Sequence, residues 1–176
     1  IYGQSLLGSV DYLIDYRARR LILAPSSALA PMIAGERVPL TWSEGRPALA
    51  ATVQARKDRA PVAARLVLDS GIDHAVLFGK LADDVSRNGL SAAVAIETAF
   101  GSRIAGVASV KLRVAGRDRR LDVALMPERR DRDEDGLLPT SMFKSVLISP
   151  IEGVVVVDGQ LTLSSEVEKK SLVCRP

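Results

Sequence analysis

The chain has few residues of the types that build disulfides, zinc sites and aromatic cores. Its 176 residues include 1 cysteine, 1 histidine and only 4% aromatic residues. The single cysteine, Cys174, cannot form an internal disulfide, so the sequence does not report the redox compartment. One histidine without a second cysteine excludes the usual zinc-binding combinations. We therefore expect no metal site and no cofactor.

Long apolar runs and clustered charge are also lacking. No run reaches the length that spans a membrane, and no signal peptide is visible. The net charge is only +3, and the arginines are scattered without the interleaved aromatic residues of a nucleic-acid-binding surface. We expect no membrane span and no nucleic-acid partner.

The first residue is Ile1, which predicts that the chain is part of a longer protein. A targeting signal would lie upstream of these residues. Such a signal would place the protein in the periplasm or outside the cell, and without it the compartment is unknown.

The residues that are abundant favour one globular β-rich domain. Hydrophobic residues make up 47% of the chain and charged residues 26%, with Val, Leu and Ala prominent. Short apolar runs separated by polar turns predict strands, as in Leu13–Tyr16 and Leu21–Leu23. Leu81 and Val85, followed by Asn88-Gly89, suit a short helix. The length allows one sizeable core and makes a second full domain unexpected.

The pattern divides the chain into four predicted segments. Residues 1–24 are predicted to form a hairpin or arm. Residues 25–37 are predicted to be a linker, because this stretch contains small residues and prolines and has no periodic apolar pattern. Residues 38–164 form the domain proper. Residues 165–176 are a charged tail that could fray.

One stretch organises the rest. The apolar run 66–68 ends abruptly in Asp69-Ser70-Gly71, and a second apolar run, 75–78, follows. A carboxylate directly after a buried strand, on a turn that glycine allows to bend, lies at the edge of a core. At such a place the pKa of a carboxyl group is easily moved, which favours acid–base chemistry. A polar turn whose aspartate bonds only its own backbone is the alternative.

Leu-Val-Leu-Asp69-Ser70-Gly71, together with the later Asp135-Gly136-Leu137-Leu138-Pro139-Thr140, resembles one lobe of the aspartic peptidases, specifically the single-lobed retropepsin-like branch. The resemblance covers about residues 38–163. It implies an all-β acid-protease lobe, a closed β-barrel with one or two short helices. The segment 1–24 also resembles the closing piece of such a lobe, which would make the parent protein two-lobed. A hairpin that pads the sheet edge is an equal alternative.

The resemblance also implies roles for particular residues. Asp69 would be the catalytic carboxylate, with Ser70 and Gly71 shaping the active-site turn. A strand through Gly136, Leu137 and Leu138 would pass beneath it in a psi-shaped loop crossing. A flap over substrate corresponds by position to Thr98, Ala99, Phe100 and Gly101, although the residues by themselves favour an ordinary hairpin tip.

Aspartic peptidase chemistry needs two facing carboxylates that share one proton. This chain offers one candidate turn. The second aspartate must come from a homodimer mate or from a second lobe of the same parent protein. The expected substrate is a peptide or protein, and the expected activity is that of an aspartic-type endopeptidase.

Three residues depart from the resembled pattern. Ile72 stands where a small residue is usual, Asp73 adds a nearby carboxylate, and Pro139 replaces a usual glycine. These departures weaken the peptidase interpretation and leave room for the alternative, a catalytically inactive β module for peptide binding or dimerisation. A weaker alternative is a periplasmic or secreted regulatory lobe.

A Ser70–Asp73–His74 hydrolase is disfavoured, because neighbours along a strand point to opposite faces. We expect His74 to be a partly buried strand residue.

Overall fold

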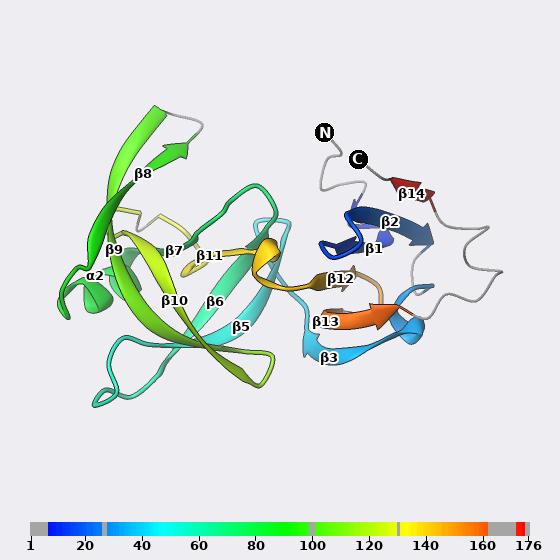
Figure 1. The fold of residues 1–176 in the computed structure, drawn as a ribbon, viewed down its shortest axis with the longest axis horizontal. Coiled ribbons are helices and arrows are strands. Elements are labelled where there is room, and N and C mark those ends of the chain that lie inside the picture. The colour runs from blue at the N-terminus through cyan, green and yellow to red at the C-terminus, as the bar shows by residue number, and fades with distance from the viewer. Residues whose placement is uncertain (1–6, 26–27, 99–100, 130, 162–171, 175–176) are drawn as a thin grey trace. The chain divides into compact units, whose positions relative to one another are not determined.

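The computed structural model describes residues 7–25, 28–98, 101–129, 131–161 and 172–174 (Figure 1). Within these residues the regular structure is mostly β-strand, with the α-helix α2 Gly79–Ser86 and two short 3-10 helices. It divides into two compact units, residues 1–49 with 140–176 and residues 50–139. No helix among the described residues is long and apolar enough to cross a membrane.

The first unit, made of residues 1–49 and 140–176, is built from hairpins and short connecting turns. Its elements are β1 Val10–Asp15, β2 Arg20–Pro25, η1 Ala30–Met32, β3 Ile33–Pro39, β4 Thr41–Ser43, η2 Thr140–Met142, β12 Ser145–Ser149, β13 Val154–Leu161 and β14 Leu172–Cys174. The strand β5, Arg46–Gln54, begins in this unit and ends in the other. The expected hairpin over residues 13–23 is confirmed as β1 and β2.

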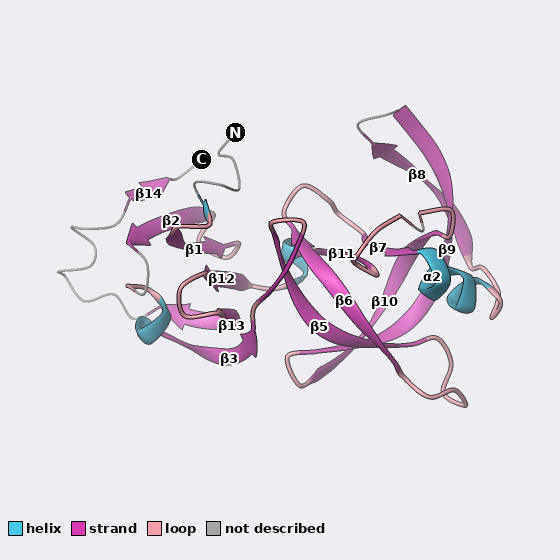
Figure 2. Cartoon of the chain, turned by 180° about the vertical axis from the view of Figure 1, so that it is seen from behind, coloured by secondary structure: helices cyan, strands magenta, loops and turns pink. Residues whose placement is uncertain are grey.

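The six-stranded sheet of the first unit, in the order β14-β2-β1-β12-β13-β3, repeats one hairpin design twice (Figure 2). The hairpins β1–β2 and β12–β13 have the same register and loops of equal length, residues 16–19 and 150–153. Thus Ile14 pairs with Leu21 as Ile148 pairs with Val155. The hairpins meet where β1 pairs antiparallel with β12. The sheet therefore has an approximate two-fold relation between its halves.

Asp11 is a buried carboxylate in the middle of this sheet. It is fully buried and accepts hydrogen bonds from the Leu29 N–H at 2.8 Å and the Ser149 hydroxyl at 2.6 Å. The Ala30 N–H adds a longer one at 3.4 Å. These hydrogen bonds compensate for the loss of hydration of the buried carboxylate. Because two of the donors lie at η1 and one in β12, Asp11 links the η1 segment to the sheet.

Replacing Asp11 tests this structural role. We expect Asp11→Ala to lower the free energy of unfolding by about 2 kcal/mol, because it leaves buried donors without an acceptor. Ser149→Ala, which removes one donor only, should cost about 1 kcal/mol. Urea denaturation of both variants measures the difference. Equal and negligible losses would contradict the role.

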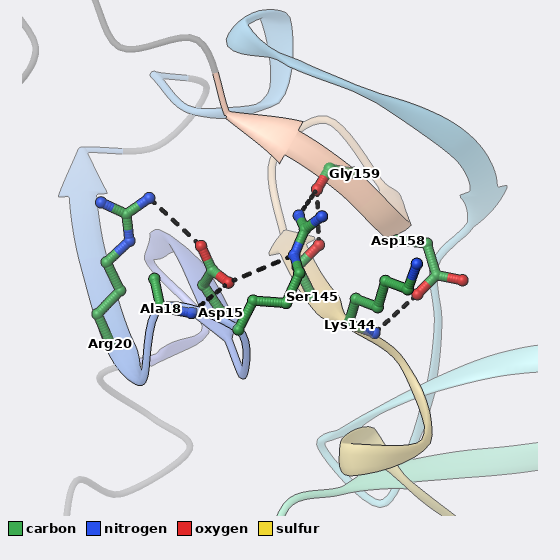
Figure 3. A network of polar contacts seen from close by, with 8 residues as sticks. Asp15, Ala18, Arg20, Lys144, Ser145, Asp158 and Gly159 are labelled. Carbon is green, nitrogen blue, oxygen red and sulfur yellow. Dashed lines mark hydrogen bonds and ion pairs between the residues drawn. The ribbon is translucent and has the colours of Figure 1, made fainter.

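The β1–β2 turn is held by a second carboxylate, Asp15 (Figure 3). Asp15 accepts a hydrogen bond from the Ala18 N–H at 3.1 Å and pairs with Arg20 at 3.3 Å. Arg17 donates to the Gly159 carbonyl, which also accepts from the Ser145 hydroxyl. The Arg17 bond therefore fastens the turn to β13.

The second unit, residues 50–139, contains the remaining strands and the helix. They are β6 Val62–Asp69, β7 Ala75–Phe78, α2, β8 Ala92–Thr98, β9 Gly101–Val114, β10 Arg117–Met126 and β11 Gly136–Pro139. The sheet order is β4-β5-β6-β11-β7-β10-β9-β8, and β5 pairs additionally with β9. The helix α2 contacts β7, β9 and β10. A cluster of buried residues between the strands includes Val76, Phe78, Ala124 and Met126.

At the β9–β10 turn, Asp118 faces two cations. Lys111 lies 2.8 Å from Asp118 Oδ2, and Arg113 lies 3.9 Å from Oδ1. The hydrogen bond from Lys111 holds the pKa of the Asp118 carboxyl below its ordinary value, with the positive charges of Lys111 and Arg113 acting in the same direction.

A lowered pKa in the folded state fixes the sign of the pH dependence. The pair contributes to stability above the ordinary carboxyl pKa, and this contribution is lost as the pH falls through the lower folded pKa. We expect Lys111→Gln to raise the pKa of Asp118, measured by ¹³C NMR titration of the carboxyl carbon. Lys80→Gln is the matched control and should leave the pKa unchanged. An unaltered titration in Lys111→Gln would contradict the assignment.

The observed division differs from the four predicted segments. The expected linker, 25–37, contains η1 and most of β3, because Ile33–Pro39 pairs with β13. The expected arm, 1–24, supplies two inner strands of the first unit's sheet. The expected domain, 38–164, is split between the two units. Within the expected tail, 165–176, Leu172–Cys174 forms β14 against β2, and the rest lies outside the described residues.

Candidate functional site

Asp69 stands at the carboxyl end of β6. Leu66, Val67 and Leu68 before it are all buried, which explains the continuous apolar run in the sequence. Asp69 itself is half-buried. The carboxylate therefore lies at the edge of the core of this unit, as the sequence predicts.

β11 runs between the two strands that lead into and out of the Asp69 turn. It pairs parallel with β6, so that Leu137 lies opposite Val67 and Leu138 opposite Leu68. It pairs antiparallel with β7, where Gly136 lies opposite Leu77. This places a late strand inside an earlier strand–turn–strand. β11 is therefore flanked on both sides by the strands of the Asp69 turn.

Gly136 makes this close approach of three strands possible. A Cβ atom built on it would lie 2.2 Å from the Val76 carbonyl oxygen and 3.2 Å from a Leu66 methyl group. Leu138 is fully buried and Leu137 half-buried against the core. The residues predicted to support the turn are thus brought beside β6.

The turn is closed by its own backbone. Asp69 Oδ1 accepts a hydrogen bond from the Gly71 N–H at 2.8 Å, and Ser70 and Gly71 are exposed. Gly71 does not have a positive φ, so the expected need for glycine's conformational freedom is not what places it here. A Cβ at this position would lie 3.3 Å from Asp69 Oδ1. The glycine therefore keeps space beside the carboxylate.

Two of the four predicted flap residues, Thr98 and Gly101, belong to the β8–β9 pair. Thr98 ends β8 and pairs with Gly101, the first residue of β9, while Ala99 and Phe100 lie outside the described residues. In the sheet order, β9 is separated from β6 by β11, β7 and β10. The hairpin carries an unusually exposed apolar residue, Ile104, with 84% of its surface accessible.

Asp135 is part of the quoted motif, but the sequence assigns it no role, because it lies in a dense charge run, residues 128–135, that predicts a solvated loop. Its Oδ2 accepts from the Arg65 N–H at 2.8 Å, and its N–H donates to the Arg65 carbonyl at 2.9 Å. Its carbonyl accepts from the Phe78 N–H at 2.8 Å. Asp135 thus joins β6 and β7 just before β11 enters between them. Its position directly before Gly136 was the available signal.

Two other expectations need correction. Glu134 is buried and pairs with Arg132 at 3.8 Å, so the charge run is not wholly a solvated loop. His74 is exposed and precedes β7, so it is not a partly buried strand residue. An exposed side chain at a bend contributes little to the core, which explains why a polar residue is accommodated there.

Chemically, the arrangement presents one carboxylate at a strand end, beside an exposed turn. Ser70 is exposed beside it and offers a hydroxyl group. Among the described residues, no three side chains of the metal-ligating types come together.

Comparison with known proteins finds no matching family model and no matching curated protein. Among solved structures, the chain is similar to the solution structure of the simian foamy virus (mac) protease. The similarity covers 53% of this chain and 88% of that chain, with 20% sequence identity and a TM-score of 0.37.

Proposed function

We propose that the chain is part of an aspartic endopeptidase and that Asp69 supplies one of its two catalytic carboxylates. The observation that carries the proposal is the position of Asp69 at the end of β6, with β11 passing between β6 and β7. The pairing of β5 with β9 supports the further proposal that the strands close into a retropepsin-like barrel. Peptides and proteins are the proposed substrates.

In the proposed mechanism two carboxylates share one proton across a water molecule. One carboxylate takes a proton from the water as it attacks the scissile carbonyl carbon, and the other donates its proton to the carbonyl oxygen. The Gly71 N–H bond to Asp69 would orient the carboxylate. Ser70 would bond across to the partner turn, and residues 98–101 would cover the substrate as a flap.

The second carboxylate would come from a second lobe of the same parent protein or from a homodimer mate. The repeated hairpin design of the first unit supports the two-lobed arrangement. β12–β13 follows the Asp69-bearing unit directly, and β1–β2 matches it in register. If an equivalent unit preceded β1, the hairpin β1–β2 would follow that unit as β12–β13 follows the Asp69-bearing unit.

A binding or dimerisation module without activity is the second candidate, and Pro139 and Ile72 favour it. Pro139 lies opposite Asp69 in the β6–β11 register, and Ile72 is half-buried next to the turn. A bulky or rigid residue at either place would restrict the approach of a partner turn.

Cleavage of a peptide library, followed by mass spectrometry from acid to neutral pH, tests the proposal. For a homodimer, specific activity should rise with protein concentration, because the second carboxylate arrives by association. For a two-lobed parent, cleavage should appear only when the upstream sequence is present. Absence of cleavage in both forms would favour the inactive module.

A further inference from the structure

A pocket lies at the end of β6 remote from Asp69, between the β5–β6 turn and the end of α2. Its volume of about 520 Å³ is in the range of small-ligand sites. The residues lining it include Val53, Arg56, Arg59, Val62, Val85 and Arg87. The strand β6 runs from Val62 to Asp69 (Figure 1). About 23 Å of extended strand therefore separates the pocket from the candidate catalytic turn.

The rim of the pocket is positively charged. The lining contains one carboxylate, Asp84, and three arginines, Arg56, Arg59 and Arg87. Arg87 pairs with Asp84 at 3.2 Å and Arg56 with Asp58 at 3.0 Å, but both pairs are exposed to solvent and therefore weak. Within the described part of the chain, Arg59 has no ion pair. Its guanidinium group is available to a ligand.

The floor of the pocket is aliphatic. Val53, Leu81 and Val85 are buried beneath it, and Val62 is 47% exposed at its edge. An exposed valine beside three guanidinium groups provides both apolar contact and charge. A ligand that matches this surface carries an aliphatic side chain next to anionic groups.

The positive surface continues beyond the first pocket. A second hollow of about 280 Å³ shares Ala55 and Arg56 with it. Its cationic lining residues are Arg56, Lys57, Lys111, Arg119 and Arg120. Asp118, its one lining carboxylate, is already held by Lys111. Two adjoining hollows with an excess of positive charge suit an extended anionic chain better than a small ion.

We propose that these two hollows bind an acidic peptide segment. Carboxylates of the segment would pair with Arg59 and Arg56, which present planar forks suited to them, and an aliphatic side chain would rest on the valine floor. A nucleic acid fits less well, because no aromatic residue lines either hollow to stack a base. If Asp69 is catalytic, the surface would hold part of a protein substrate away from the cleavage point.

The test is fluorescence anisotropy with a labelled short peptide of alternating glutamate and leucine. The full chain carrying Asp69→Asn is used, so that hydrolysis cannot interfere. A glutamine–leucine peptide of the same length should bind about tenfold more weakly or worse. Arg59→Glu should weaken binding of the acidic peptide about tenfold, because it reverses the charge of a guanidinium group that has no ion pair among the described residues.

Lys80→Glu is the matched control, since Lys80 is an exposed residue of α2 that lines neither hollow. It makes the same change in net charge and should leave the affinity unaltered. Equal losses in the two variants, equal affinity for the acidic and neutral peptides, or tighter binding of oligothymidylate would overturn the proposal. If the unmodified chain binds the acidic peptide but the assembly cleaves no peptide, the peptidase proposal is contradicted and the binding proposal stands.

Discussion

Asp69→Asn is expected to reduce peptide hydrolysis by about 10³-fold, because an amide can neither take a proton from water nor share one with a second carboxylate. The fold should survive the change. Asn keeps an Oδ1 acceptor for the Gly71 N–H, and the side chain is only half-buried. Initial rates of cleavage, with circular dichroism and the unfolding midpoint of the same samples, measure both expectations.

Asp73→Asn is the matched control for that variant. Asp73 is an exposed carboxylate close in sequence to Asp69, and solvent screens its charge. We expect its removal to change the rate by about twofold at most. Full activity in Asp69→Asn, or an equal loss in Asp73→Asn, would show that the carboxylate at position 69 does not perform the reaction.

Gly136→Ala is expected to lower the free energy of unfolding by about 3 kcal/mol or more, because overpacking between tightly paired strands cannot be relieved by a rotamer change. The new methyl group would lie 2.2 Å from the Val76 carbonyl oxygen, a backbone atom of β7. This clash can be relieved only if β11 moves away from β7 or if β6 and β7 move apart. Chemical denaturation measures the loss.

Gly71→Ala separates this effect from the general cost of replacing glycine. Its Cβ would contact only Asp69 Oδ1, at 3.3 Å, and its φ is not in the left-handed range. We expect a stability change of less than about 1 kcal/mol. A Gly136→Ala variant as stable as Gly71→Ala would mean that β11 does not lie between β6 and β7 as described.

Local patterns were sufficient to predict several elements of the fold, but not β3 and β14, which form in the expected linker and tail. The apolar run before Asp69, the alternation in β9 and the Leu81–Val85 spacing in α2 each follow from the chemistry of neighbouring residues. The pairing of β1 with β12 could not be predicted in the same way. The register of strands more than a hundred residues apart depends on which apolar edges meet in the folded chain.

The candidate site was predicted where it depends on one short stretch and missed where it depends on tertiary contacts. Asp69 was visible because a buried strand that ends in a polar turn has a recognisable sequence, whereas the Gly136–Leu138 strand was predicted from the family resemblance. Asp135 was part of the motif that carries the resemblance, but its contact with the Arg65 backbone arises only in the folded chain. Glu134 was missed for the same reason, because its burial and its pairing with Arg132 arise from the fold.

The most direct test is a crystal structure of the cleaving assembly with a peptide whose scissile bond is replaced by a hydroxyethylene group. Such a group mimics the tetrahedral intermediate and should bind where charge develops. The account predicts its hydroxyl within hydrogen-bond distance of an Asp69 carboxylate oxygen and of a second carboxylate from another lobe or protomer. A hydroxyl bound away from Asp69, or facing Asp69 without a second carboxylate, would contradict it.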